Sequence, residues 1–161
     1  MIRVLFVCLG NICRSPLAEG IFQSKVDAAG LGELIQSDSA GTGSWHIGDP
    51  PDSRMIETAR RHGIQIGGLR GRQFRAEDHT AFDYILAMDH HNLSDILAMR
   101  PRGELTSRSD LFRSFDPSPD NGSVPDPYYG RSDGFERVYE IVERTSVALL
   151  ESLVEKHELP Q

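Results

Sequence analysis

The sequence predicts a single α/β domain over residues 1–161, built on a four-stranded, twisted parallel sheet with helices on both faces. Strand-like and helix-like segments alternate along the chain, which is typical of βαβ units. The clearest strand segments are apolar throughout, as in parallel strands buried on both faces. Right-handed crossovers then place helices on both sides of the sheet. The chain is long enough for one hydrophobic core and too short for two comfortable domains.

The first two elements follow from an apolar run and a helix-start signal. We expect a strand near residues 2–8, which are rich in β-branched and aromatic side chains. The first helix should cover residues 16–29, with Ser15 as its N-cap and Pro16 as its first residue.

The middle of the chain repeats this alternation. We expect a short strand near residues 34–39 and a helix near residues 52–63, closed by Gly63. Residues 83–89 again form an apolar strand pattern, and Asp89 should cap the helix that follows, although it could instead brace a loop.

The C-terminal part supplies the last strand and the longest helix. A fourth strand is predicted near residues 111–115, and apolar side chains at helical spacing predict a helix over residues 133–157. Residues 40–51 and 116–130 are rich in Gly, Pro, Asp and Ser, so both should be loops. Because ligands of open α/β sheets bind beyond the carboxyl ends of the strands, both loops could reach the end of the first strand.

A cysteine ends that first strand, and Arg14 closes the loop after it. The loop should curl so that successive backbone N–H groups point inward and form an anion-binding nest at a helix terminus; it consists of Leu9, Gly10, Asn11, Ile12 and Cys13. The same N–H groups favour a thiolate on Cys8, and an ionised sulfur is a nucleophile. The Arg14 guanidinium can bind two oxygens of a phosphoryl group.

Two further loop residues have expected roles. Ser15 could donate a hydrogen bond to the sulfur and make it a better leaving group, and Asn11 could hold a left-handed turn. The alternative is that Cys8 is a small apolar residue at a strand end and Arg14 an ordinary helix-start residue. The strand-to-helix position of the pair and the Ser-Pro that follows favour the catalytic interpretation.

Composition argues against several classes of function. The formal net charge of −7 disfavours a general affinity for nucleic acids or anionic membranes. We expect no signal peptide, since the first residues include the charged Arg3 and lack a long apolar core and a small-residue cleavage site. We also expect no membrane-spanning segment, since no apolar stretch approaches ~20 residues. The only cysteines, Cys8 and Cys13, are too close together for a disulfide framework, which indicates a reducing compartment, and we infer the cytoplasm. The six histidines lack a convincing ligand spacing, so we expect no metal and no cofactor.

These motifs resemble the low-molecular-weight protein tyrosine phosphatases. The matching segments occur in the order found in that family and cover nearly the whole chain: VCLGNICRSP at 7–16, SAGT at 39–42, Trp45, MD at 88–89 and DPYYG at 126–130. The first and last segments together are specific. The resemblance implies the phosphotyrosine protein phosphatase I-like fold and hydrolysis of phosphotyrosine in proteins, and of small aryl phosphates, through a cysteinyl phosphate.

The resemblance also implies an acid for the leaving group. Asp126 would protonate the leaving oxygen and later activate water, so that inorganic phosphate is released. We expect a nearby phosphate dianion and partial burial to keep its carboxyl protonated. From the segment alone, a plain Asp-Pro turn is equally consistent.

Aromatic residues would form the walls of the site. Trp45, Tyr128 and Tyr129 could face a phenyl ring, although Trp45 could instead be a core residue. By resemblance, phosphatases of this fold that act on phosphoarginine have a threonine at the position of Ile12, so the isoleucine favours phosphotyrosine.

Three positions have supporting roles by resemblance. Ser39 would hydrogen-bond Asn11 and steady the loop. Cys13 would trap an oxidised Cys8 as a disulfide, or else only pack. The family often has a histidine that supports the loop asparagine, and this chain has Leu69 there instead.

Two other functions compete with the phosphatase. An arsenate reductase of the same fold needs further cysteines to relay oxidation, and this sequence has none after Cys13, although an external thiol could substitute for them. A module that binds phosphotyrosine without turnover would not need Asp126 beside an intact loop. We expect a monomer, with a weak dimer as the alternative.

Overall fold

Four parallel strands form one sheet in the order β2-β1-β3-β4. In the computed structural model, which describes residues 1–128, 130 and 133–161, the strands are β1 (Ile2–Cys8), β2 (Ile35–Gly41), β3 (Tyr84–Ala87) and β4 (Arg108–Leu111). β1 pairs with both β2 and β3. This central position brings the last residue of β1 between two neighbouring strands and confirms the predicted parallel sheet.

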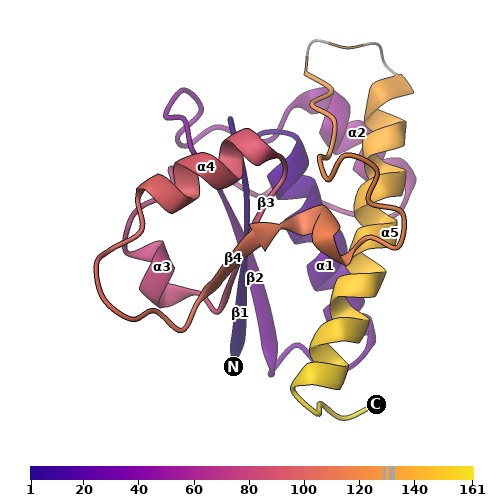
Figure 1. Ribbon diagram of the computed structural model, residues 1–161. Coiled ribbons are helices and arrows are strands. Elements are labelled where there is room, and N and C mark those ends of the chain that lie inside the picture. The colour runs from indigo at the N-terminus through magenta and orange to yellow at the C-terminus, as the bar shows by residue number, and fades with distance from the viewer. Residues whose placement is uncertain (129, 131–132) are drawn as a thin grey trace.

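Helices cover both faces of the sheet, as predicted (Figure 1). On one face lie α1 (Arg14–Ala28), α2 (Ser53–Arg61) and α5 (Asp133–Lys156). On the other face lie α3 (Asp78–Ala81) and α4 (His90–Ala98). In the part of the chain that is described, none of the helices is both long and apolar enough to cross a membrane.

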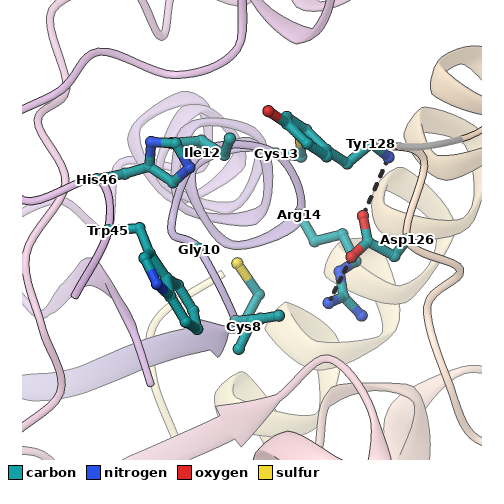
Figure 2. Close-up of a pocket in the computed structure, with 10 residues that line it drawn as sticks. Cys8, Gly10, Ile12, Cys13, Arg14, Trp45, His46, Asp126 and Tyr128 are labelled. Carbon is teal, nitrogen blue, oxygen red and sulfur yellow. Dashed lines mark hydrogen bonds and ion pairs between the residues drawn. The ribbon is translucent and has the colours of Figure 1, made fainter. Parts of the chain in front are cut away.

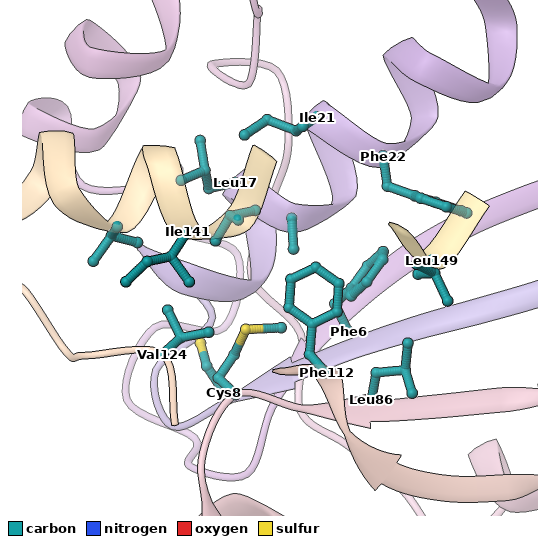
Figure 3. Close-up of a cluster of buried hydrophobic side chains, with 14 of the residues drawn as sticks. Phe6, Cys8, Leu17, Ile21, Phe22, Leu86, Phe112, Val124, Ile141 and Leu149 are labelled. Atoms are coloured by element: carbon teal, nitrogen blue, oxygen red, sulfur yellow. The ribbon is translucent and has the colours of Figure 1, made fainter. Parts of the chain in front are cut away.

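Alternate side chains of β1 enter two separate apolar clusters, which fixes the strand in place. Phe6 packs edge-on against Phe22 of α1 and Phe112, with ring centroids 5.6 and 5.2 Å apart (Figure 3). Leu5 and Val7 enter the cluster on the other face. Cys8 belongs to the same cluster as Phe6. Because both faces of β1 are buried, the end of the strand is held rigidly.

The first helix starts earlier than predicted. α1 begins at Arg14 instead of Pro16, and Cys13 takes the N-cap position without a capping hydrogen bond from its side chain. Ser15 therefore lies within the first turn, and its hydroxyl is used elsewhere. Pro16 is still tolerated, since the first four N–H groups of a helix have no partner within it.

The region of the fourth strand was also predicted incorrectly. β4 ends at Leu111, and the segment predicted as its core is a 3-10 helix, η1 (Phe112–Phe115). The apolar residues of this segment are buried because Phe112 packs on Phe6, not because they alternate along a strand. The short helix α3 was not predicted at all, and β2 extends two residues past the predicted strand.

Candidate active site

The loop between β1 and α1 wraps around the Cys8 sulfur. Asn11 has a φ of 56°, the left-handed conformation predicted for it. In this conformation its backbone N–H donates to Cys8 Sγ at 3.2 Å. Ser15 Oγ lies 3.0 Å from the same sulfur, on the side of the first helical turn. The sulfur thus has polar partners on two sides although Cys8 is only 3% exposed.

The end of β2 and the two residues that follow it support the loop. Thr42 N donates to Cys8 O and Gly43 N donates to Leu9 O, both at 2.9 Å. A Cβ atom on Gly41 would lie 2.8 Å from Leu9 O and 3.1 Å from Asn11 N. Glycine therefore allows the loop backbone to pass directly over the end of β2.

The Asn11 amide ties the loop to the rest of the molecule. Its Nδ2 donates to Ser15 Oγ at 2.8 Å and to Ser39 Oγ at 3.0 Å, which is the contact that the family resemblance implied for Ser39. Its Oδ1 accepts from Arg72 N at 3.0 Å. Leu69, at the position of the family's histidine, packs against the apolar core instead.

Arg14 is buried behind the sulfur and held from one side. Its Nη1 donates to Asp89 Oδ2 at 2.7 Å and to Val124 O at 3.1 Å. Burial alone would lower the pKa of Arg14, but the negative charge on Cys8, the Asp89 bond and the Asp126 carboxylate raise it above its ordinary value. The guanidinium therefore remains a cation next to the sulfur. Asp89 fills both predicted roles, since its Oδ1 also caps α4 by accepting from Asn92 N at 2.7 Å.

A pocket of about 290 Å³ opens above the sulfur. It is lined by Cys8, Leu9, Gly10, Ile12, Cys13, Arg14, Trp45, His46, Asp126 and Tyr128. Trp45 and His46 stand on one side of the sulfur, with Asp126 and Tyr128 on the other (Figure 2). Both predicted loops thus reach the site. Trp45 is 70% exposed, so the alternative that it is a core residue is wrong.

Asp126 lies at the mouth of this pocket. Its Oδ1 accepts from Tyr128 N at 3.1 Å, and its Oδ2 is 3.5 Å from Arg14 Nη2 (Figure 2). The side chain is 41% exposed, so its burial is partial, as expected. The carboxyl group thus lines the same pocket as the Cys8 sulfur. Tyr129, the other predicted wall, lies outside the described residues.

Two residues contribute to the site without having been predicted. Arg54 of α2 donates to Tyr128 O at 3.1 Å, lies 5.6 Å from the centre of the Tyr128 ring and is paired with Asp52. His46 lines the pocket, with its Nδ1 3.1 Å from Asp49 Oδ2. A single sequence carries no signal for the contact of Arg54 with Tyr128, which spans 74 residues. His46 lies in a loop that was expected to reach the site, but only its neighbour Trp45 was singled out there.

Neither Cys8 nor Cys13 forms a disulfide. Burial, followed by the negative charges of Asp52, Cys8 and Asp126, raises the pKa of the Cys13 thiol well above its ordinary value. Cys13 is therefore an uncharged thiol at neutral pH, in contrast to the role assigned to Cys8. Among the described residues, no three His, Cys, Asp or Glu side chains are grouped so as to hold a metal ion.

Comparison with known proteins gives a consistent result. A family model described as low molecular weight phosphotyrosine protein phosphatase matches residues 3–159. The low molecular weight protein-tyrosine-phosphatase YfkJ of Bacillus subtilis is 42% identical over 159 residues, which cover 99% of this chain and 100% of that protein.

Solved structures agree in fold. A protein tyrosine phosphatase from Entamoeba histolytica superposes with a TM-score of 0.91 at 38% identity, covering 98% of this chain and 99% of the other. A Drosophila arginine phosphatase superposes with a TM-score of 0.88 at 32% identity, covering 94% and 97%. The sheet, the loop and the matches over almost the full length show that this chain belongs to the low molecular weight phosphotyrosine protein phosphatase family.

Proposed function

We propose that Cys8 is the nucleophile with which this chain hydrolyses phosphotyrosine. The sulfur attacks phosphorus in line with the tyrosine oxygen, and the S–P bond forms as the P–O bond breaks. The equatorial oxygens are then bound by the loop N–H groups and by Arg14, which offset the charge of a loose transition state. The product of this step is a cysteinyl phosphate.

Asp126 acts as acid and then as base in this proposal. It gives its proton to the leaving tyrosine oxygen and later takes one from the water that attacks the cysteinyl phosphate. Inorganic phosphate leaves, and Cys8 returns to the thiolate. The position of Asp126 at the pocket mouth, beside Arg14, supports this assignment.

The pocket walls favour an aryl ester as substrate. Trp45 and Tyr128 line the pocket on opposite sides of the sulfur, where their flat side chains can contact an aromatic ring (Figure 2). Ile12 lines the pocket with an apolar side chain and offers no hydroxyl to a guanidino group. We therefore place proteins that carry phosphotyrosine ahead of phosphoarginine substrates.

Further properties follow from a thiolate mechanism. A reactive Cys8 requires a reducing environment, which supports a cytoplasmic location. Its sulfenic acid could condense with the Cys13 thiol, releasing water, and recovery of activity by dithiothreitol after peroxide treatment would depend on Cys13. We propose that residues 1–161 act as one catalytic domain and as a monomer, which sedimentation would test.

One observation carries the proposal: Cys8 Sγ accepts from Asn11 N at the base of a pocket that Arg14 and Asp126 also line. Hydrolysis rates on matched peptides carrying phosphotyrosine, phosphoserine or phosphoarginine test the substrate. We expect the phosphotyrosine peptide to be cleaved at least about a hundredfold faster, and a preference for phosphoarginine would overturn the assignment. Cys8→Ser should abolish hydrolysis while phosphate still binds.

A further inference from the structure

Glu19 is a partly buried carboxyl group that the proposed mechanism does not use. Glu19 lies on α1 one turn after Ser15, so the two side chains share a face of the helix. Glu19 Oε1 accepts a hydrogen bond from Ser39 Oγ at 2.7 Å. Ser39 in turn contacts the Asn11 amide, so Glu19 is connected to the catalytic loop although it does not line the pocket.

The groups at the two ends of this network, Arg72 N and the Glu19 carboxylate, determine the direction of each hydrogen bond between them. Asn11 Oδ1 accepts from Arg72 N, so the Asn11 Nδ2 group must face the two serines. It donates to both hydroxyl oxygens, and each hydroxyl proton must therefore point elsewhere.

Each serine has a clear acceptor for that proton. The Ser39 proton points to the Glu19 carboxylate, at 2.7 Å. For Ser15 the nearer acceptor is Cys8 Sγ at 3.0 Å, and the alternative, Ala40 O, is at 3.4 Å. The chain Glu19, Ser39, Asn11, Ser15 thus ends in a hydroxyl that donates to the sulfur.

Charged groups from two other elements face Glu19: Asp38 of β2 and Arg72, which follows α2 in sequence. Arg72 also donates to Asp38 Oδ2 at 3.2 Å and to Asp78 at 3.1 and 3.2 Å. Its positive charge is therefore shared among the carboxylates of Asp38, Asp78 and Glu19. Burial, with a contribution from Asp38, raises the pKa of Glu19 to about 7, although the Ser39 bond and Arg72 act in the opposite direction. Both protonation states of Glu19 are therefore populated near neutral pH.

We propose that Glu19 is a positioning residue, whose carboxylate orients the Ser39, Asn11 and Ser15 groups so that the Ser15 hydroxyl donates to the Cys8 sulfur. The inference rests on the proposed role of Cys8. A carboxylate can only accept, so it fixes the Ser39 hydroxyl in one orientation. A protonated Glu19 can donate to Ser39 Oγ instead and then competes with Asn11 Nδ2 for that oxygen.

The orientation matters most when the sulfur departs. When water attacks the cysteinyl phosphate, the S–P bond breaks, its electron pair returns to sulfur, and the Ser15 proton stabilises the forming thiolate. Loss of the Glu19 charge should therefore lower kcat more than it changes KM.

The test compares Glu19→Gln with Gln23→Ala over pH 5.5 to 8.5, with p-nitrophenyl phosphate as substrate. Gln23 is a matched control, since it lies one turn further along α1 and its Oε1 accepts from Ser37 N and Oγ of the same strand at 2.9 Å. At pH 8 we expect Glu19→Gln to lower kcat about fivefold, because a charge-assisted hydrogen bond is replaced by a weaker neutral one. At pH 5.5, where Glu19 of the parent protein is protonated, the loss should be less than about twofold.

A ratio of kcat between parent and Glu19→Gln that stays constant over this pH range would overturn the inference, as would an equal pH-dependent loss in Gln23→Ala. Should Glu19→Gln fold poorly, Ser39→Ala breaks the same chain. It should lower kcat at pH 8 to a similar extent, and a Ser39→Ala variant with full kcat would equally refute the role. Cys8→Ser separates the two claims: if it stays active, the proposed function fails, whereas an inactive Cys8→Ser with a normal Glu19→Gln defeats only this inference.

Discussion

At the scale of single residues, one carboxyl group and one cation lie side by side in the pocket. Arg14 Nη2 and Asp126 Oδ2 are 3.5 Å apart, and Arg14 Nη1 is already bonded to Asp89. When a phosphoryl group enters, its oxygens compete with Asp126 for the guanidinium. The negative charge of the phosphoryl group next to the Asp126 carboxylate then favours the protonated form of Asp126, which is the form required of an acid.

Asp126→Asn should therefore slow substrates according to their leaving groups. For phenyl phosphate, whose phenoxide is a poor leaving group, we expect kcat to fall about 10²-fold or more, the usual contribution of a general acid. For p-nitrophenyl phosphate the first step needs little protonation and should slow far less. Initial rates on the two esters measure this difference, and equal slowing on both would show that Asp126 is not the acid.

Ser15 shows where local rules misjudge a residue. Its sequence position before Pro16 satisfies the rules for an N-cap, but its hydroxyl lies 3.0 Å from the Cys8 sulfur instead. The loop turns into α1 two residues early, and Cys13 takes the capping position. The expected bond from Ser15 to the sulfur was thus compatible with the structure, and the expected cap was not.

At the scale of elements, the end of β2 determines how closely the loop can approach the sheet. A methyl group at Gly41 would meet backbone atoms of Leu9 and Asn11, which cannot move without shifting the loop. Gly41→Ala should lower kcat about tenfold or more and reduce the free energy of unfolding by ~1–3 kcal/mol. Steady-state kinetics and urea unfolding measure both effects.

Gly68→Ala is the control for this change. A Cβ at Gly68 meets nothing within 4 Å, so the variant should keep its activity and lose no stability. Equal behaviour of the two variants would mean that the space over Gly41 does not matter.

The extent of successful prediction differs between elements for a physical reason. β1 and α5 could be predicted because burial on both faces, or on one helical face, leaves a clear apolar pattern. η1 was mistaken for a strand because Phe112 is buried by an aromatic contact with Phe6 rather than by strand alternation. Arg54 could not be predicted, since it contacts Tyr128 across 74 residues of sequence.

At the scale of the whole molecule, a buried ion cluster joins α5, η1 and the loop that leads to Asp126. Asp116 accepts from Arg113 of η1 at 2.9 Å and from Arg144 of α5 at 2.8 and 2.9 Å, and its side chain is fully buried. Arg113 also donates to Ser118 O and Ser123 O, both at 2.7 Å. The cluster therefore fixes the loop that leads to Asp126 to η1 and α5.

Asp116→Asn should destabilise the fold strongly at neutral pH. It leaves the buried Arg113 without its counter-charge, which costs about 3 kcal/mol or more in the free energy of unfolding. Asp110→Asn removes a more exposed partner, that of Arg108, and should cost no more than about 1 kcal/mol. Urea unfolding at pH 7 compares them, and similar losses in both variants would refute the importance of the cluster.

The same aspartate gives a direction to the pH dependence of stability. Burial alone would raise its pKa, but hydrogen bonds from Arg144, Ser118 and Arg113 lower the pKa of Asp116 to about 2, from an ordinary value of 3.8. Its stabilising contribution is therefore fully present above pH 3.8 and is lost as the pH falls through about 2. The difference in stability between parent and Asp116→Asn should narrow over that interval.

Covalent catalysis by Cys8 is the central step of the proposed mechanism. Acid quenching of Asp126→Asn during turnover of p-nitrophenyl phosphate, followed by mass spectrometry of the peptides, measures this directly, because loss of the base that activates water should let the intermediate accumulate. We predict one phosphoryl group per chain, on the peptide that contains Cys8 and absent from Cys8→Ser. Turnover with no phosphorylated enzyme, or with phosphate on another residue, would contradict the mechanism.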